Sequence, residues 1–211
     1  MDLCVIEGDG VGYEVIPAAV RVLKALLPEV KIHPLRAGFE TFRATGTPLP
    51  PETLTLAQEV RAVLFGAADS PSFPVDGYYS PIIALRRHLN TYASVRPTRF
   101  LPVIAARQGV DLVVVRENTE DLYVVNEQTE ADGNTSTAQK VITRAATERV
   151  SRLTYELARQ ADRDQVTIVH KANILPQSDG LFRRVALEIA EAYPDIETDE
   201  LLVGQLALKS G

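Results

Sequence analysis

The chain has 211 residues, enough for one large domain or two small ones, and 45% of them are hydrophobic and 24% charged, as in ordinary globular proteins. A net charge of −6 without a basic run argues against nucleic acid as a partner. No apolar run approaches the roughly 20 residues of a membrane span, and the start does not resemble a secretory signal. With a single cysteine, no intramolecular disulfide is possible, so we expect a cytoplasmic protein that does not bind membranes.

The first half of the chain alternates predicted strands and helices. Apolar runs predict strands at residues 3–6, 30–34 and 61–65. Apolar residues at helical spacing predict helices at residues 15–27, 51–58 and 82–89. Residues 70–80 are rich in proline, glycine and aromatic residues, which predicts a loop.

The second half continues this pattern, with strands predicted at 110–115 and 166–170 and helices at 144–159 and 179–193. The run 110–115 is continuously apolar, which predicts a strand buried on both faces. The alternation predicts an α/β fold with a largely parallel sheet. A boundary is expected at 97–102. Residues 127–136 are polar, with a turn predicted at Asp132-Gly133-Asn134.

The end of the chain does not fit this pattern. Residues 201–203 begin like a strand, but no helix is predicted over 204–211. A layered α/β fold needs such a helix to cover its sheet. We therefore expect the chain to be shorter than its fold requires.

Three closely spaced glycines separate the first predicted strand from the first predicted helix, a place where phosphates often bind. Gly12 comes one residue too early for the dinucleotide fingerprint. Glu7 and Asp9 would also repel a pyrophosphate. The alternative, favoured by the local sequence, is a tight turn that requires glycine.

Three arginines are candidates for holding a small anion. Arg86 lies on a predicted helix, Arg96 beside a proline, and Arg116 at the carboxyl end of the 110–115 strand. A guanidinium fork binds a carboxylate with two parallel hydrogen bonds, and ligands gather at the carboxyl ends of parallel strands. A lone arginine is more often a solvated surface charge. Arg116 differs, because a charge at the end of a buried strand needs a partner or a ligand.

Tyr123 and Lys171 are candidates for moving protons. Lys171 follows the 166–170 strand, and desolvation beside arginines would favour its neutral, basic form. The alternatives are a rim aromatic for Tyr123 and an exposed surface lysine for Lys171. Asn173 can both donate and accept hydrogen bonds. His170 has no second histidine at ligand spacing, so we expect a structural role.

Five segments together resemble the metal-dependent, NAD(P)-linked β-decarboxylating dehydrogenases of 2-hydroxy acids, which include isocitrate, 3-isopropylmalate, homoisocitrate and tartrate dehydrogenases. The segments are IEGDGVG at 6–12, FGAA at 65–68, the stretch 85–97 with its LR and VRP, VRENTEDLY at 115–123 and HKANIL at 170–175. The resemblance extends to about residue 203.

The resemblance implies an isopropylmalate-dehydrogenase-like layered α/β fold of two domains, incomplete at its C-terminus. Residues 1–97 would form the N-terminal half of the large domain. Residues 98–211 would form a small dimerisation domain with an arm near 124–141. A homodimer or a higher homo-oligomer is implied as well.

The resemblance also implies a role for each candidate residue. Arg86, Arg96 and Arg116 would bind the malate part of a polycarboxylate substrate. Tyr123 would help to protonate the enol after CO2 leaves. Lys171 would take the hydroxyl proton, and in the family this lysine is donated across a dimer interface.

The remaining implied contacts involve the cofactor and the rest of the substrate. Asn173 would lie near substrate and nicotinamide. Ala68, Asp69 and Ser70 would form the loop at the nicotinamide end, with Ser70 also near the substrate. Asp69 is an unusual residue for this position in the family.

Ser80 faces the variable part of the substrate in this resemblance. The segment 80–87 looks most like homoisocitrate dehydrogenases of lysine synthesis, and isocitrate enzymes also carry a serine there. Ile82 and Ile83 are apolar, as in isopropylmalate enzymes, so that alternative stays open. A distal carboxylate needs a hydroxyl or a cation, whereas an isopropyl group needs aliphatic walls.

The implied reaction is NAD-dependent oxidation and decarboxylation of homoisocitrate to 2-oxoadipate, with Mg2+ or Mn2+. Family members hold the metal with three aspartates. One of these positions is Gly204 here and the other two would lie beyond residue 211, so we expect no metal ligand in this chain and little or no activity from it alone. The choice between NAD and NADP is also left open. The alternative from another class is a catalytically inactive anion-binding and dimerisation module.

Overall fold

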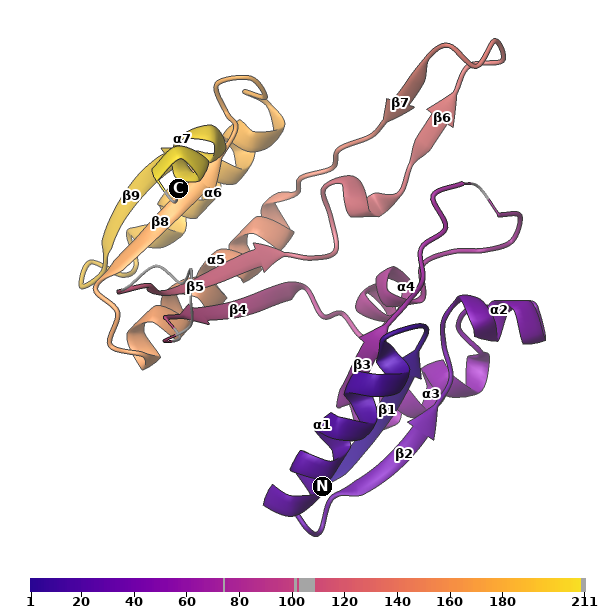
Figure 1. Cartoon of the computed structure of the whole chain (residues 1–211). Coiled ribbons are helices and arrows are strands. Elements are labelled where there is room, and N and C mark those ends of the chain that lie inside the picture. Colours follow the sequence, from indigo (N-terminus) through magenta and orange to yellow (C-terminus); the bar gives the residue numbers. More distant parts are fainter. Residues whose placement is uncertain (74, 101, 103–108, 210–211) are drawn as a thin grey trace. The chain divides into compact units, whose positions relative to one another are not determined.

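The computed structural model describes residues 1–73, 75–100, 102 and 109–209, without the side chains of 207–209. The chain divides into two compact units, Met1–Thr91 and Tyr92–Gly211 (Figure 1). Residue 101 of the predicted boundary region and residues 210–211 of the predicted chain end lie outside the described residues. The assignment of 1–97 and 98–211 to a large and a small domain stays a prediction.

The first unit is built on a parallel sheet of three strands in the order β2-β1-β3. The strands are β1 (Asp2–Gly8), β2 (Lys31–Leu35) and β3 (Val63–Ala67). All three were predicted, and their parallel pairing confirms the α/β fold class for this unit. Pro34 is tolerated because β2 lies at the edge of the sheet, where proline need not donate a hydrogen bond.

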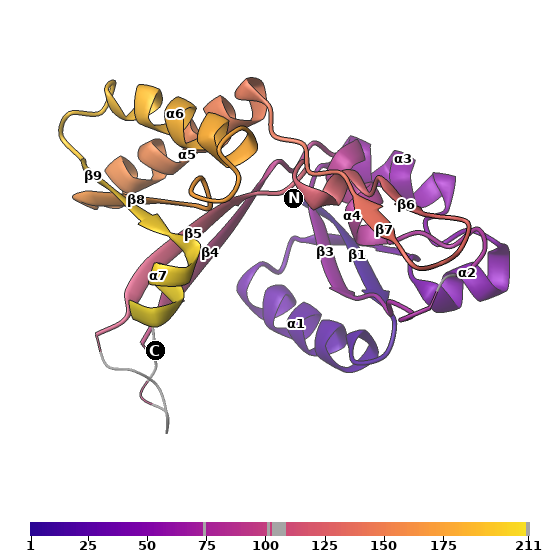
Figure 2. The same cartoon turned by 90° about the horizontal axis from the view of Figure 1, so that it is seen from above.

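Helices cover both faces of this sheet (Figure 2). They are α1 (Gly12–Leu26) on one face and α3 (Pro51–Val60) and α4 (Pro81–His88) on the other. Side chains alternate along β1, so Leu3 and Val5 pack with Ile16 of α1, whereas Ile6 packs on the opposite side. This alternation builds two apolar layers around one buried strand.

The second unit contains three two-stranded sheets in its described residues. Antiparallel pairs are β4 (Ala93–Arg99) with β5 (Asp111–Glu117), and β6 (Glu127–Thr129) with β7 (Ser136–Ala138). A parallel pair is β8 (Gln165–His170) with β9 (Glu197–Leu202). The prediction of a largely parallel sheet is therefore wrong for this unit.

Two long helices, α5 (Arg144–Gln160) and α6 (Ser178–Ala190), pack on each other and on β8 (Figure 1). Their core contains Tyr155 and Tyr193, whose rings stack with centroids 4.9 Å apart. A further helix, α7 (Val203–Lys209), contradicts the expectation that no helix follows residue 203. None of the helices in the described parts of the chain is long and apolar enough to cross a membrane.

The prediction that residues 110–115 are buried on both faces is wrong. Leu112 is 46% exposed and Val114 is 49% exposed. Among the described residues, β5 has one neighbouring strand, and only α5 packs closely against it. A continuous apolar run in the sequence is therefore not sufficient to predict that both faces of a strand are covered within the same chain.

Candidate functional site

A buried carboxylate organises the glycine-rich turn after β1. Asp9 is only 3% exposed, and its side chain accepts hydrogen bonds from three backbone N–H groups. The donors are Phe39 at 2.8 Å, Glu40 at 3.0 Å and Asp69 at 2.8 Å. Asp9 thereby caps α2 (Phe39–Thr45), a short helix that the sequence did not predict, and fixes the loop after β3.

Close backbone contacts require glycine at positions 8 and 12 of the turn. Gly8 has a φ of +79°, and a Cβ added there would lie 1.7 Å from the Ala67 carbonyl oxygen. A Cβ on Gly12 would lie 1.9 Å from the Glu7 carbonyl oxygen. These contacts support the tight-turn interpretation and account for Gly8 and Gly12 without a phosphate.

The loop of Ala68, Asp69 and Ser70 is fixed through its backbone. Besides the bond from Asp69 N–H to Asp9, the Asp69 carbonyl accepts a hydrogen bond from the Tyr78 hydroxyl at 2.6 Å. Burial, together with the nearby negative charges of Asp9 and Asp69, raises the pKa of Tyr78. Asp69 and Ser70 are exposed and Ala68 is half-buried, so a rigid loop presents two polar side chains to solvent.

Ser80 and Arg86 lie at opposite ends of α4. Ser80 is the N-cap, and its hydroxyl accepts a long 3.5 Å hydrogen bond from Ile83 N–H. This bond gives Ser80 a structural role that is independent of any substrate. Arg86 is half-buried in the last turn, whereas the adjacent Arg87 is exposed.

The first unit therefore holds five of the predicted site residues. They are Ala68, Asp69, Ser70, Ser80 and Arg86. The second unit holds the other five. They are Arg96, Arg116, Tyr123, Lys171 and Asn173.

Within the second unit, Arg96 and Arg116 share one face of the β4–β5 sheet. The register places Ser94 opposite Arg116, and Ser94 and Arg96 are two residues apart on one strand. Arg96 Nε donates to Ser94 Oγ at 3.2 Å. The two arginines are thus diagonal neighbours across the pair of strands.

Arg116 and Tyr123 are in direct contact. The guanidinium carbon of Arg116 lies 5.2 Å from the centre of the Tyr123 ring, within cation–π range. Arg116 Nη2 donates to Asn118 Oδ1 at 3.1 Å. Arg116 Nε is buried and has no hydrogen-bond partner among the described residues. A buried charged donor without a hydrogen-bond partner is rare, and a bound anion would account for it.

The turn that follows Arg116 is held by a second carboxylate, Glu117. It accepts hydrogen bonds from Thr119 N–H, from Thr119 Oγ1, from Glu120 N–H and from Arg149. Burial alone would raise the pKa of Glu117, but these donors outweigh it and lower the pKa below its ordinary value. Glu120 in turn accepts hydrogen bonds from the N–H and Oγ1 of Thr143, the N-cap residue of α5.

Lys171 follows β8, and its backbone is held by Asp179 in the first turn of α6. Asp179 is 8% exposed, and its Oδ1 accepts the Lys171 N–H at 2.8 Å. Its Oδ2 binds Lys140 Nζ. Sequence reasoning assigned no role to Asp179 or Lys140. The one available signal was an acidic residue in the first turn of a predicted helix, which suggests only a favourable end charge.

His170 and Asn173, on either side of Lys171, differ in their contacts. His170 Nδ1 accepts the Ala172 N–H at 3.2 Å, and its Nε2 lies 3.4 Å from Glu200 Oε2. These contacts fit the structural role expected for His170. Asn173 is exposed in the turn before α6.

The described residues contain no group of three or more histidines, cysteines, aspartates or glutamates that could hold a metal ion. Gly204 stands where the resemblance places an aspartate. A Cβ added at Gly204 would lie 4.0 Å from Lys171 Nζ. Position 204 therefore faces Lys171 but supplies no carboxylate.

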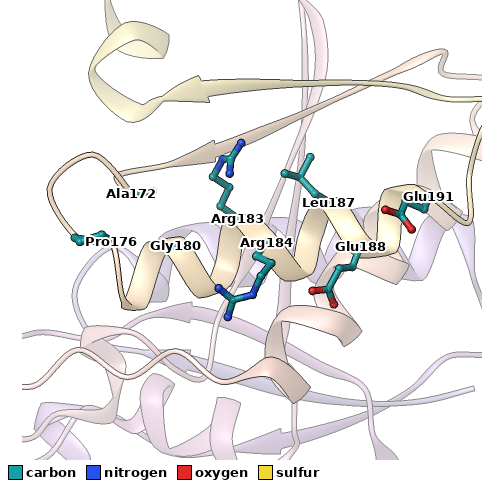
Figure 3. Close-up of a pocket in the computed structure, with 8 residues that line it drawn as sticks. All are labelled: Ala172, Pro176, Gly180, Arg183, Arg184, Leu187, Glu188 and Glu191. Atoms are coloured by element: carbon teal, nitrogen blue, oxygen red, sulfur yellow. The ribbon is translucent and has the colours of Figure 1, made fainter.

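An open groove of about 510 Å³ runs along α6 (Figure 3). Its charged side chains are Arg183, Arg184, Glu188 and Glu191. Arg183 is paired with Glu200, and Glu188 with Arg144. None of the predicted site residues lines this groove, so the candidate site is defined by the residues above.

Comparison with known proteins gives a consistent result. A family model described as isocitrate/isopropylmalate dehydrogenase matches residues 2–210. The match continues past residue 203, where the resemblance was expected to end, so that limit was wrong. The chain is 44% identical over 207 residues to the isocitrate/homoisocitrate dehydrogenase of Thermus thermophilus and 42% identical over 220 residues to the homoisocitrate dehydrogenase of Methanocaldococcus jannaschii.

The similarity extends to structure. The crystal structure of isocitrate dehydrogenase from Methylococcus capsulatus has a TM-score of 0.94 and 38% identity to this chain. The match covers 99% of this chain and 62% of that one. The two curated relatives are covered over 61% and 62% of their lengths, and this chain over 98% and 99%. The chain thus spans about three fifths of the proteins that it matches.

Proposed function

Because the chain belongs to the isocitrate/isopropylmalate dehydrogenase family, we propose that it binds a 2-hydroxy tricarboxylic acid for NAD-dependent oxidative decarboxylation. Homoisocitrate, converted to 2-oxoadipate in lysine biosynthesis, is the proposed substrate. Isocitrate and 3-isopropylmalate are the alternatives. The family is one of dehydrogenases, and the activity of this partial chain is itself part of the proposal.

The observation that carries the proposal is the environment of Arg116. Its guanidinium group lies against Tyr123, and its buried Nε has no partner among the described residues. Arg96 lies on the same face of the sheet. Two cations and a phenol on one face suit a polycarboxylate, because each carboxylate can accept two parallel hydrogen bonds from a guanidinium fork.

The proposed roles of the individual residues are those that the family resemblance implies. Arg86, Arg96 and Arg116 bind the carboxylates of the malate part. Lys171 takes the proton of the substrate hydroxyl while the hydride leaves the same carbon, and Tyr123 returns a proton to the enol after the carbon–carboxylate bond breaks. Cation–π contact with Arg116 fixes the ring of Tyr123 for that transfer.

NAD+, when bound, supplies the hydride acceptor. Ala68, Asp69, Ser70 and Asn173 are the residues proposed to contact it. The Asp9 and Tyr78 bonds support this role for the loop, because a loop fixed through its backbone can position a ligand without losing entropy on binding. Mg2+ or Mn2+ is expected in the family, and the described residues contain no group of three or more histidines, cysteines, aspartates or glutamates that could hold it.

The preference for homoisocitrate rests on Ser80 and on relatives. The two curated relatives described above carry homoisocitrate in their names. Among the described residues Ser80 Oγ makes only a long bond to Ile83 N–H, so its hydroxyl can still donate to a distal carboxylate. Ile82 and Ile83 lie beside it and are half-buried, which keeps 3-isopropylmalate as an alternative.

A homodimer or a higher homo-oligomer in the cytoplasm is the proposed state. Exposed Leu112 and Val114 on the β4–β5 sheet support association, because apolar strands of this kind favour burial against another surface. The same feature supports the alternative of an inactive binding and dimerisation module.

Isothermal titration of the 211-residue chain with homoisocitrate, isocitrate and 3-isopropylmalate tests the binding proposal. We expect homoisocitrate to bind at least about tenfold more tightly than 3-isopropylmalate, because the distal carboxylate replaces an apolar group. Equal or undetectable binding of all three acids would contradict the proposal. Binding without turnover in a version extended to the length of the relatives would favour the module instead.

A further inference from the structure

We propose that Asp179, braced by Lys140, is a positioning residue for Lys171. This inference rests on the proposed role of Lys171 as the base that takes the hydroxyl proton. It adds two residues to which neither the sequence nor the family resemblance gave a role.

Asp179 makes a bond to the backbone of the residue that it positions. Its Oδ1 accepts the Lys171 N–H at 2.8 Å, across eight residues of chain. The segment between them is a turn in which the Ile174 and Leu175 N–H groups both bind the Lys171 carbonyl. Lys171 is therefore held at both its N–H and its C=O, which fixes the start of its side chain.

Lys140 binds the second oxygen of the same carboxylate. Lys140 Nζ contacts Asp179 Oδ2, and the side chains are 25% and 11% exposed respectively. A pair this well shielded is costly to separate, because removing one partner leaves the other charge without compensation. Asp179 therefore has little freedom to rotate away from Lys171.

Lys140 is itself anchored near the other proposed proton carrier. Its Nζ lies 3.8 Å from Asp121 Oδ2, and Asp121 pairs through its backbone with Val141. Asp121 precedes Tyr123 by two residues. One lysine thus connects the turn that carries Tyr123 to the loop that carries Lys171.

Proton abstraction by Lys171 requires that its side chain be positioned accurately. A base must lie within hydrogen-bond reach of the proton that it abstracts. Misplacement by about 1 Å can cost on the order of a hundredfold in rate. A long flexible lysine gains its precision from the backbone that carries it, and Asp179 controls that backbone.

The test compares Asp179→Ala, Asp179→Asn and Lys140→Met with Glu191→Gln, a matched control at the C-cap of the same helix. Glu191 is exposed and lies at the opposite end of α6 from Asp179 (Figure 3). The first readout is hydrogen–deuterium exchange of the Lys171 amide. Asp179→Ala should accelerate it about tenfold or more, and Asp179→Asn, which keeps an acceptor oxygen, should restore slow exchange.

The second readout is acylation of Lys171 relative to exposed Lys24, mapped by mass spectrometry. Asp179→Ala should change this ratio at least about threefold, which general destabilisation would not do selectively. The third readout is turnover of homoisocitrate by the version extended to the length of the relatives. There kcat should fall about tenfold or more in Asp179→Ala, with KM changed less than about twofold.

Lys171 exchange and reactivity in Asp179→Ala equal to those in Glu191→Gln would overturn the proposal. If Asp179→Ala does not fold, Lys140→Met decides the proposal. In Lys140→Met, a lower kcat with an altered Lys171 to Lys24 acylation ratio supports the proposal. A kcat and a ratio equal to those of the unsubstituted protein overturn it. If the version extended to the length of the relatives shows no turnover even without a substitution, the proposed function fails. Exchange and acylation alone then decide whether Asp179 positions Lys171.

Discussion

The carboxylate of Asp9 binds the backbone N–H of Asp69 at 2.8 Å, across sixty residues of sequence. The same carboxylate caps α2 through Phe39 and Glu40. One buried side chain therefore ties the turn after β1, the start of α2 and the loop after β3 together. The loop proposed to meet the nicotinamide is held by this bond.

Asp9→Ala should lower the free energy of unfolding by at least about 2 kcal/mol, because three buried N–H groups lose a charged acceptor. Asp76→Ala, at an exposed position of the same unit, should change it by less than about 0.5 kcal/mol. Urea unfolding measures both. An equal, small loss in the two variants would show that Asp9 is not an organising residue.

Tyr155 is 1% exposed, its ring stacks on Tyr193, and its hydroxyl bonds Thr198 Oγ1 at 2.8 Å. Tyr155→Ala should therefore cost about 3–5 kcal/mol, and Tyr155→Phe about 1 kcal/mol. Tyr13→Phe removes an exposed hydroxyl bond to Glu40 and should cost about 0.5 kcal/mol or less. Thermal or urea unfolding gives the three values, and a nearly neutral Tyr155→Ala would contradict the packing described here.

Glu117 should make stability depend on pH in the acid range. The pKa of Glu117 is lower in the folded state than its unfolded value of about 4.3. Its contribution to the free energy of unfolding is therefore fully present above about pH 4.3 and is lost as the pH falls through the lower, folded pKa. Glu117→Gln should flatten the loss of stability below about pH 4.3, whereas Glu156→Gln, at an exposed position of α5, should not. Denaturant unfolding between neutral and acid pH compares the slopes. Identical slopes in parent and Glu117→Gln would show that the cluster around Glu117 is not formed.

Arg116→Lys should weaken homoisocitrate binding by about tenfold or more, because lysine cannot present the two parallel donors of the guanidinium. Arg99→Lys is the matched control. Arg99 is 77% exposed at its side chain and lies on the opposite face of the β4–β5 sheet. Calorimetry on the two variants should find a loss only in Arg116→Lys. Equal affinities would remove Arg116 from the site.

The sequence predicted most elements of the first unit because their apolar patterns are local. It did not predict α2, whose start is capped by Asp9 from thirty residues away. It also missed β4, because Pro97 suggested a break. Pro97 is accommodated since β4 has β5 as its only partner among the described strands. Such tertiary causes leave no periodic signal in the sequence.

The candidate site shows the same limit. Arg116 and Tyr123 were separate candidates within one segment of the family resemblance, and the structure places them in contact. The argument that Arg116 ends a doubly buried strand was wrong, because residues 111–114 are exposed. The anchoring of Lys171 by Asp179 and Lys140 depends on three segments meeting in space, which spacing along the chain does not reveal.

The most direct test of the proposed function is NADH formation from homoisocitrate with NAD+ and Mg2+, with isocitrate and 3-isopropylmalate as comparisons. The assay uses the 211-residue chain and a version extended to the length of its relatives. We expect the extended version to turn over homoisocitrate fastest and to release NADH and CO2 in equal amounts, and the 211-residue chain to show little or no activity. No NADH from any of the three acids with the extended, folded protein would contradict the proposed function.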